Sequence, residues 1–334
     1  MDLKTLCELN GTSGDEQAVR RAILEAAKMT GANVKIDRMG NVVAFKKGSA
    51  PAGKPHVCLS AHMDEVGFIV IGATDEGLLA FKPVGGIDPR VVVSKHVRVG
   101  GLDGVIGALA IHLQTKEQRA HVLPFSELYI DIGAKTKDEA LEKAPPATYV
   151  YFESSYLPFG QGFVTAKALD DRVGCYNLLR LLDGDYACDV TCAFVTQEEV
   201  GLRGATGAAY LIDPDVALVL EGTAAGDMSD VPASRHVCDA GKGVAVSFMD
   251  NASIADQTLY QAMLKTALKE NIPCQVKRGV TGGNDAGAYQ RAKAGARTLV
   301  LSVPCRYIHG PSSVCALSDV EAQYELAKAY LMSV

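Results

Sequence analysis

Two adjacent glutamates, Glu198 and Glu199, follow an apolar run at residues 192–195 that predicts a buried strand of a parallel sheet. Neighbouring carboxylates at the end of such a strand repel each other and lose hydration, so they are costly to ionise unless a cation lies nearby. Taken alone, the pair is more often a solvated loop with two surface acids. Side chains alternate along an extended chain, so the two point in different directions, and spacing alone does not show which one would meet a cation.

Other histidines and carboxylates stand just beyond further apolar runs. They are His62 with Asp64, the pair Asp170 and Asp171, Glu221, and His309. Open parallel sheets bind ligands at the carboxyl ends of their strands, so five such ends predict one shared metal site. Two histidines with several carboxylates favour zinc, cobalt or manganese over calcium, which prefers oxygen ligands alone.

Each of these residues also has an ordinary structural interpretation. A lone histidine such as His62 is more often structural, although Asp64 could accept a hydrogen bond from its second ring nitrogen if the first held a metal. Asp170 and Asp171 precede a helical stripe, where a carboxylate usually caps the helix. One cap needs one carboxylate, which leaves the other free to bridge two cations.

The segments around these residues predict an α/β domain, with a mixed sheet flanked by helices. Apolar periodicity predicts helices after Gly14, at 170–184, near 205–211, around 259–267 and at 318–331, where residues 318–321 form a capping-box pattern. Short apolar runs predict strands at 34–36, 42–45, 56–60, 190–195, 216–220, 244–248 and 297–303, the last closed by Pro304.

The pattern changes between about residues 66 and 165, where short strand-like runs alternate with glycine turns. The runs are 68–71, 78–81, 91–93, 105–107 and 128–131, with one helix near 137–143. This texture predicts a small β-barrel or sandwich inserted into the α/β domain. The predicted organisation is a catalytic domain of residues 1–65 and 166–334 and an inserted domain of residues 66–165.

Composition excludes several classes of partner. The chain has 334 residues, a net charge of -6 and no long basic run, so nucleic acid is not expected to bind. The sequence contains no run of about 18 consecutive apolar residues, so no membrane-spanning helix is predicted, and the first residues lack a signal-peptide pattern. The nine cysteines are scattered and form no Cys-x-x-Cys pair, which fits reduced thiols in the cytoplasm.

Five stretches resemble motifs of the M42 family of metallo-aminopeptidases, which includes glutamyl aminopeptidases and the tetrahedral TET assemblies. They are residues 60–67 (SAHMDEVG), 167–172 (KALDDR), 196–204 (TQEEVGLRG), 282–287 (GGNDAG) and 306–311 (RYIHGP). The stretches come in the family's order and span nearly the whole chain. The resemblance implies a zinc-peptidase-like catalytic domain.

The resemblance also implies a pair of divalent metal ions, zinc or cobalt above all and manganese as a further candidate. One ion would be held by His62, Asp170 and Glu221. The other would be held by Asp170, Glu199 and His309, so that Asp170 bridges the two.

Two further roles follow from the same resemblance. Glu198 would be the general base that takes a proton from the metal-activated water and passes it to the leaving amine. Asp64 would orient His62. The implied activity is removal of N-terminal residues from short peptides in the cytoplasm. The inserted domain occupies the place of the family's dimerisation domain, so a homo-oligomer built from dimers is expected, with a tetrahedral dodecamer as precedent.

Two positions depart from the family pattern. Glu221 stands where most M42 aminopeptidases carry Asp, and Asn284 stands where Thr is more usual. Glutamate at the first position occurs in related two-metal carboxypeptidases and deacylases, so such an enzyme is the alternative function. A glycosidase would need two metal-free carboxylates, whereas the acids here look committed to metals. A non-enzymatic member would have lost a ligand or the base, and all six residues are present.

Overall fold

Three strands that are buried along almost their whole length form the centre of a large sheet: β3 (Val57–His62), β12 (Val190–Val195) and β13 (Val216–Ala224). Both faces of such strands are covered, which is why their sequences are nearly continuous apolar runs. The other strands of this sheet are β1 (Asn33–Ile36), β2 (Val42–Lys46), β10 (Leu157–Phe159), β11 (Phe163–Ala166), β14 (Val244–Ser247), β15 (Cys274–Lys277), β16 (Arg297–Arg306) and β17 (Ser313–Ala316).

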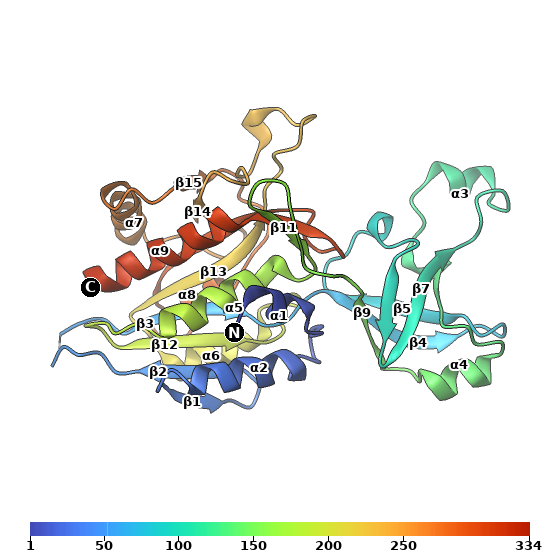
Figure 1. The fold of residues 1–334 in the computed structure, drawn as a ribbon, viewed down its shortest axis with the longest axis horizontal. Helices are drawn as coiled ribbons and strands as arrows, with labels where there is room; N and C mark the ends of the chain where they lie inside the picture. Colours follow the sequence, from blue (N-terminus) through green and yellow to red (C-terminus); the bar gives the residue numbers. More distant parts are fainter. Residues whose placement is uncertain (52) are drawn as a thin grey trace.

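The computed structural model, which describes residues 1–51 and 53–334, orders this sheet β1-β2-β12-β3-β13-β16-β17-β11-β10, with β14 on β16 and β15 on β14 (Figure 1). Strands β12, β3, β13 and β16 run parallel, and β2, β14 and β17 pair with them antiparallel. The predicted mixed α/β sheet is therefore confirmed.

Helices cover both faces of the sheet because successive strand residues point to opposite sides. Val57, Leu59 and Ala61 of β3 pack with α2, α5, α7 and α9, whereas Cys58 packs with α6 and α8. The helices of this unit are α1 (Leu3–Glu8), α2 (Gln17–Lys28), α5 (Leu169–Leu182), α6 (Arg203–Ile212), α7 (Gln257–Lys269), α8 (Ala286–Arg291) and α9 (Leu317–Ser333). Across the described ranges, no helix has the length and apolar character needed to cross a membrane.

The inserted unit is a closed six-stranded barrel, ordered β4-β5-β8-β7-β6-β9, which lies to one side of the α/β unit (Figure 1). Its strands are β4 (Gly67–Ala73), β5 (Leu79–Val84), β6 (His96–Val99), β7 (Leu102–Ala108), β8 (Leu128–Asp131) and β9 (Tyr149–Phe152). Two helices accompany it, α3 (Lys116–Ala120) and α4 (Lys137–Lys143). Phe68 fills the interior and packs edge-on against Phe81 and Phe152.

Two parts of the insert differ from the sequence prediction. The barrel ends at Phe152, and β10 and β11, which we expected within the insert, join the large sheet because β11 pairs antiparallel with β17. The strand expected at 91–93 does not form. Instead, Asp88 accepts a hydrogen bond from the backbone of Arg90 and begins a short 3-10 turn at Pro89–Val91.

The C-terminal elements differ in two details. The capping box expected at 318–321 does not form, because α9 already begins at Leu317, which places Ser318 inside the helix, and Glu321 pairs with Arg180 at 2.8 Å. Strand β16 also continues through Pro304 to Arg306. Pro304 falls between the residues that pair with β14 and those that pair with β17, so its missing N–H interrupts no ladder on that edge.

Candidate metal centre

Four parallel strands bring most of the candidate ligands to one edge of the sheet. Because β12, β3, β13 and β16 are neighbours in the sheet, their carboxyl ends meet at that edge. They carry, in this order, Glu198 with Glu199, His62, Glu221 and His309. Glu221 lies inside β13 rather than beyond it, since this strand continues to Ala224.

Asp170 reaches the site by another route. It is the second residue of α5, which follows β11 after a two-residue connection, and β11 pairs only antiparallel. The prediction that all five groups end parallel strands is therefore wrong for this residue. Asp170 and Asp171 have non-helical backbone angles at the start of α5. Their two carboxylates consequently face different surroundings.

The hydrogen bonds distinguish the two aspartates. Asp171 is buried and accepts from the backbone N–H of Gly174 at 3.0 Å and of His62 at 3.2 Å, so it ties the helix start to the end of β3. The Oδ1 atom of Asp170 is buried and has no hydrogen-bond partner in the described part of the chain. Asp171 is therefore the structural carboxylate, and Asp170 is the one left available for a cation.

Both histidines present the same ring nitrogen to the carboxylates. His62 Nδ1 lies 3.0 Å from the backbone oxygen of Asp64, and His309 Nδ1 lies 2.8 Å from that of Gly86. A carbonyl oxygen can only accept, so Nδ1 carries the proton in each ring. Nε2 is thereby left to face the site, which is the arrangement of a metal-binding imidazole.

The distances at Nε2 fit two adjacent cation positions. His62 Nε2 lies 3.4 Å from Asp170 Oδ1 and 3.7 Å from Glu221 Oε2. His309 Nε2 lies 3.4 Å from Glu199 Oε2 and 3.7 Å from Asp170 Oδ2. Two ligands of one tetrahedral zinc ion are about 3.4 Å apart, given metal–ligand distances of about 2.0–2.2 Å. The two oxygens of Asp170 thus face two different histidines.

Unpaired oxygens support the same assignment. Besides Asp170 Oδ1, Glu221 Oε1 is buried without a partner in the described ranges. A buried carboxylate oxygen with neither hydrogen bond nor counter-charge is strongly unfavourable, and a divalent cation removes that cost. Asp171 also has an oxygen close to His62 and Glu221, but its hydrogen bonds to backbone N–H groups leave it the poorer ligand.

The ionisation of the cluster shows its need for positive charge. Burial raises the pKa of Glu221 and of Glu198 well above the usual glutamate range, and raises that of Glu199 to about 7. Burial alone would lower the pKa of His309, but the carboxylates of Asp170 and Glu199 raise it to about 9. Without a cation, the site therefore takes up protons to balance its acids.

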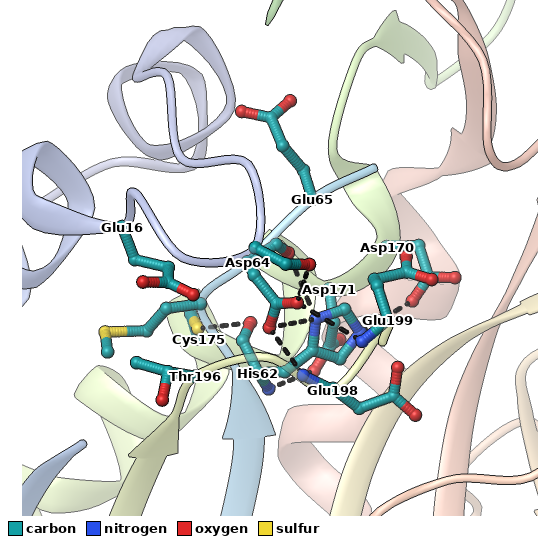
Figure 2. Close-up of polar contacts among 12 residues, drawn as sticks. Glu16, His62, Asp64, Glu65, Asp170, Asp171, Cys175, Thr196, Glu198 and Glu199 are labelled. Atoms are coloured by element: carbon teal, nitrogen blue, oxygen red, sulfur yellow. Dashed lines mark hydrogen bonds and ion pairs between the residues drawn. The ribbon is translucent and has the colours of Figure 1, made fainter. Parts of the chain in front are cut away.

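Asp64 connects the two glutamates to the histidine strand (Figure 2). Its carboxylate accepts from the backbone N–H of Glu198 at 3.0 Å and of Glu199 at 3.2 Å, and from Ser13 Oγ at 2.6 Å. The same carboxylate lies 3.5 Å from His62 Nδ1, farther than the backbone oxygen of Asp64. Asp64 thus holds the Glu198–Glu199 backbone in place as well as contacting the histidine.

A cavity of about 490 Å³ opens onto these ligands. It is lined by His62, Asp170, Glu198, Glu199, Glu221 and His309, together with Lys277 at the end of β15 and loop residues that include Gly86 and the glycines at 282 and 283. A larger groove of about 940 Å³ lies elsewhere, between the β1–β2 turn and helices α6 and α8. That groove contains none of the candidate ligands, so the smaller cavity is the candidate active site.

The loop before α8 contains a residue whose position the sequence did not reveal. Asp285 is fully buried, and neither of its carboxylate oxygens has a partner among the described residues. Burial raises its pKa to about 7. The only sequence signal was its place in the stretch 282–287.

Neighbouring Asn284 donates to Asp250 at 2.7 Å and accepts from the backbone of Ala286 at 3.0 Å, so the amide serves to hold this loop.

Comparisons with known proteins agree over almost the entire chain. The family profile described as M42 glutamyl aminopeptidase matches residues 40–326. A lysyl aminopeptidase from Pyrococcus furiosus is 32% identical over 340 residues, which cover 98% of this chain and 95% of the relative. An aminopeptidase from the archaeon Desulfurococcus kamchatkensis is 33% identical, with a TM-score of 0.94 over 99% of this chain and 94% of the other.

A further solved structure is the TET1 peptidase of Pyrococcus horikoshii, which can assemble into a tetrahedron or a large octahedral shell. It is 35% identical, with a TM-score of 0.86 over 99% of this chain and 98% of the other. The fold, the order of the motifs and the profile match all agree. The chain belongs to the M42 family of aminopeptidases.

Proposed function

We propose that this protein is a two-metal aminopeptidase that removes N-terminal residues from short peptides. The observation that carries the proposal is Asp170, whose two oxygens face the Nε2 atoms of two different histidines. His62, Asp170 and Glu221 would hold one ion, and Asp170, Glu199 and His309 the other. The imidazole and carboxylate ligands suit zinc or cobalt, and also manganese. The nine free cysteines fit action in the cytoplasm.

The protein's own groups supply positioning and proton transfer. Divalent ions held at this site would polarise the peptide carbonyl and acidify the attacking water. Glu198 lines the cavity beside the ligands and would accept the proton of that water, then deliver it to the departing amine. Asp64 keeps the backbone of Glu198 fixed through the hydrogen bond to its N–H.

A substrate screen tests the proposal against its alternative. Glu221 in place of the usual Asp is the feature that favours a dinuclear carboxypeptidase or deacylase, yet its longer side chain still reaches within 3.7 Å of His62. The screen uses aminoacyl anilides, N-blocked peptides and C-terminally amidated peptides, with metal-stripped and metal-reloaded protein. An aminopeptidase cleaves the anilides and the amidated peptides and ignores the blocked ones. Cleavage of N-blocked peptides alone would favour the alternative.

Activity is expected to fall on the acid side, with a limb that depends on metal concentration. His309 and Glu199 have raised pKa values, about 9 and about 7, so both tend to hold protons that an incoming ion must displace. Metal affinity therefore falls as pH falls from about 9, and more free metal should move the limb to lower pH. Rates measured against pH at several buffered zinc concentrations check this. If the acid limb of the profile does not move with zinc concentration, the limb reflects a titrating group other than the metal ligands.

We further propose that the barrel mediates self-association. The segment between β7 and β8 carries exposed apolar side chains, including Ile111 and Leu113, which are 70% and 63% exposed. Apolar surface of this kind typically marks an interface, and soluble oligomers usually close symmetrically. The TET1 relative, which assembles into shells, provides the precedent.

Light scattering should therefore show a homo-oligomer built from dimers. Changing both Ile111 and Leu113 to Lys should yield smaller species, because charges at a buried interface are costly to desolvate. The matched control is Leu268→Lys, on α7 of the α/β unit, where the leucine is 82% exposed. A wild-type protein that is monomeric at micromolar concentration with metal present would refute the proposal.

A further inference from the structure

A serine outside the five motif stretches reaches the metal centre. Ser13 lies in the loop between α1 and α2 and is only 5% exposed. Its hydroxyl donates to Asp64 Oδ2 at 2.6 Å, whereas the backbone N–H groups of Glu198 and Glu199 bind the same carboxylate at 3.0 and 3.2 Å. So short a bond from a hydroxyl to a buried carboxylate is of the strong, charge-assisted kind. The mechanism above gives it no role.

The backbone around Ser13 fixes the position of this hydroxyl. The Ser13 N–H donates to the backbone oxygen of Glu65 at 3.2 Å, and Thr12 forms a parallel bridge with Glu65. Two residues further on, Asp15 accepts a hydrogen bond from Tyr151 of the barrel strand β9. The loop is thereby attached to the end of β3 and to the barrel, so Ser13 is a fixed donor.

Ser13 restricts the rotation of the Asp64 carboxylate. The torsion that turns an aspartate carboxylate is broad, so its orientation depends on its hydrogen bonds. His62 contributes little, because its Nδ1 faces the backbone oxygen of Asp64 at 3.0 Å and the carboxylate lies 3.5 Å away. Glu198 donates to Oδ1, and Ser13 and Glu199 donate to Oδ2. Without the hydroxyl, mainly two backbone N–H groups would orient the carboxylate.

The backbone just before Glu198 needs such support because it is strained. Gln197 has a φ of 56°, in the left-handed region that residues with a Cβ rarely adopt. A conformation of this kind persists only where surrounding contacts hold it. Thr196 N–H donates to Asn41 Oδ1 at 2.9 Å before the strained residue, and Asp64 binds the two N–H groups after it. A less fixed Asp64 would let the Glu198 backbone relax away from the cavity that this side chain lines.

We propose that Ser13 is a positioning residue for Glu198 and acts through the Asp64 carboxylate. The inference rests on the proposed aminopeptidase function, in which Glu198 accepts the proton of the attacking water. A general base works only when its carboxylate lies within hydrogen-bond reach of that proton. Ser13 is not among the described residues that line the cavity, so it is not expected to contact the substrate.

Kinetics of Ser13→Ala test the proposal. The substitution should lower kcat on an aminoacyl anilide about 10-fold, the low end of what losing a partner behind a metal site costs. KM should stay within about twofold, because substrate binding is not altered. Both ions should remain bound, so excess zinc should not restore kcat. The matched control is Ser49→Ala, which removes a hydroxyl that donates to the Tyr186 backbone oxygen at 3.3 Å outside the cavity and should change none of these values.

A double-mutant cycle shows whether Ser13 acts through Asp64. Asp64→Ala removes the carboxylate that Ser13 orients, so adding Ser13→Ala to this variant should lower kcat no further. Thermal unfolding and metal content are measured for every variant, so that loss of fold is recognised.

Hydrogen exchange of the metal-free protein gives a readout that does not depend on activity. The N–H groups of Glu198 and Glu199 should exchange about 10-fold faster in Ser13→Ala than in the wild-type protein, because their acceptor is less fixed. The Ser49→Ala control should exchange like the wild-type protein at both positions.

Four results would overturn the inference: unchanged exchange at Glu198 and Glu199, a kcat of Ser13→Ala within about twofold of the wild-type value, full recovery of kcat in excess zinc, or additive losses in the cycle. Each would leave the aminopeptidase proposal intact if the wild-type protein cleaves anilides. A wild-type protein that cleaves no anilide would instead refute the aminopeptidase proposal. Faster exchange in Ser13→Ala would then still support Ser13 as the residue that positions the Glu198 backbone.

Discussion

Replacing Glu198 by glutamine is expected to lower kcat by about two to four orders of magnitude, the usual contribution of a positioned general base. Glutamine has the same shape, and the backbone N–H at this position remains bonded to Asp64. The substitution removes only the proton acceptor, so the protein should still bind two metal ions per chain. The prediction is tested by measuring kcat from steady-state kinetics and the metal content per chain by mass spectrometry.

The neighbouring residue supplies the matched comparison. Glu199 Oε2 lies 3.4 Å from His309 Nε2 and belongs to one ligand cluster with Asp170. A neutral amide is a weaker ligand, so Glu199→Gln should lose one ion, and excess zinc or cobalt should restore part of the activity. If Glu198→Gln loses an ion and Glu199→Gln keeps both, the two roles are reversed. If both variants stay fully active, the two-metal hydrolase proposal is wrong.

The second large effect is expected at Asp170. Its oxygens face His62 and His309, so the substitution Asp170→Asn removes a ligand from both positions at once. Metal affinity should fall by more than about 100-fold, beyond the 10- to 100-fold typical of residues that only support ligands. Activity should fall to background at metal concentrations that saturate the wild-type protein. Calorimetric titration of the metal-free variants with zinc measures the affinity.

Asp171→Asn is the control for this variant because it changes the adjacent carboxylate in the same way. Asp171 accepts two backbone hydrogen bonds, one on each oxygen, and an amide can accept only one of them. This variant should keep its metals but lose about 1–3 kcal/mol of stability, the cost of one unsatisfied buried N–H group. Thermal unfolding of the metal-free protein tests this. Metal loss in Asp171→Asn with normal binding in Asp170→Asn would exchange the two assignments.

The sequence by itself determined the α/β class, the inserted barrel and the order of nearly all helices and strands. These depend on periods of two and 3.6 residues, which neighbouring residues set by themselves. The strand predicted at 190–195 and the helix predicted near 137–143 have those bounds in the structure. The motifs around His62, Glu198 and His309 also identified the family, because each motif is continuous in the sequence.

Several boundaries depended on partners far along the chain. Strand β11 belongs to the large sheet because it pairs with β17, about half the chain away, and its own residues are equally compatible with the barrel. The capping box at 318–321 gave the wrong prediction because α9 begins before Ser318, and because Glu321 pairs with the distant Arg180 instead. Local rules cannot include such competitors.

The tertiary structure alone decided how the candidate ligands are supported. Asp170 and Asp171 are indistinguishable by spacing, and the partners that separate them are His62 and Gly174. His309 is oriented by the Gly86 carbonyl, which follows strand β5 of the barrel. Lys277 joins the same cavity only because β15 attaches through β14 to the central strands. Hydrogen bonds, burial and charge of this kind arise between distant segments, so they exist only once the sheet and the barrel have come together.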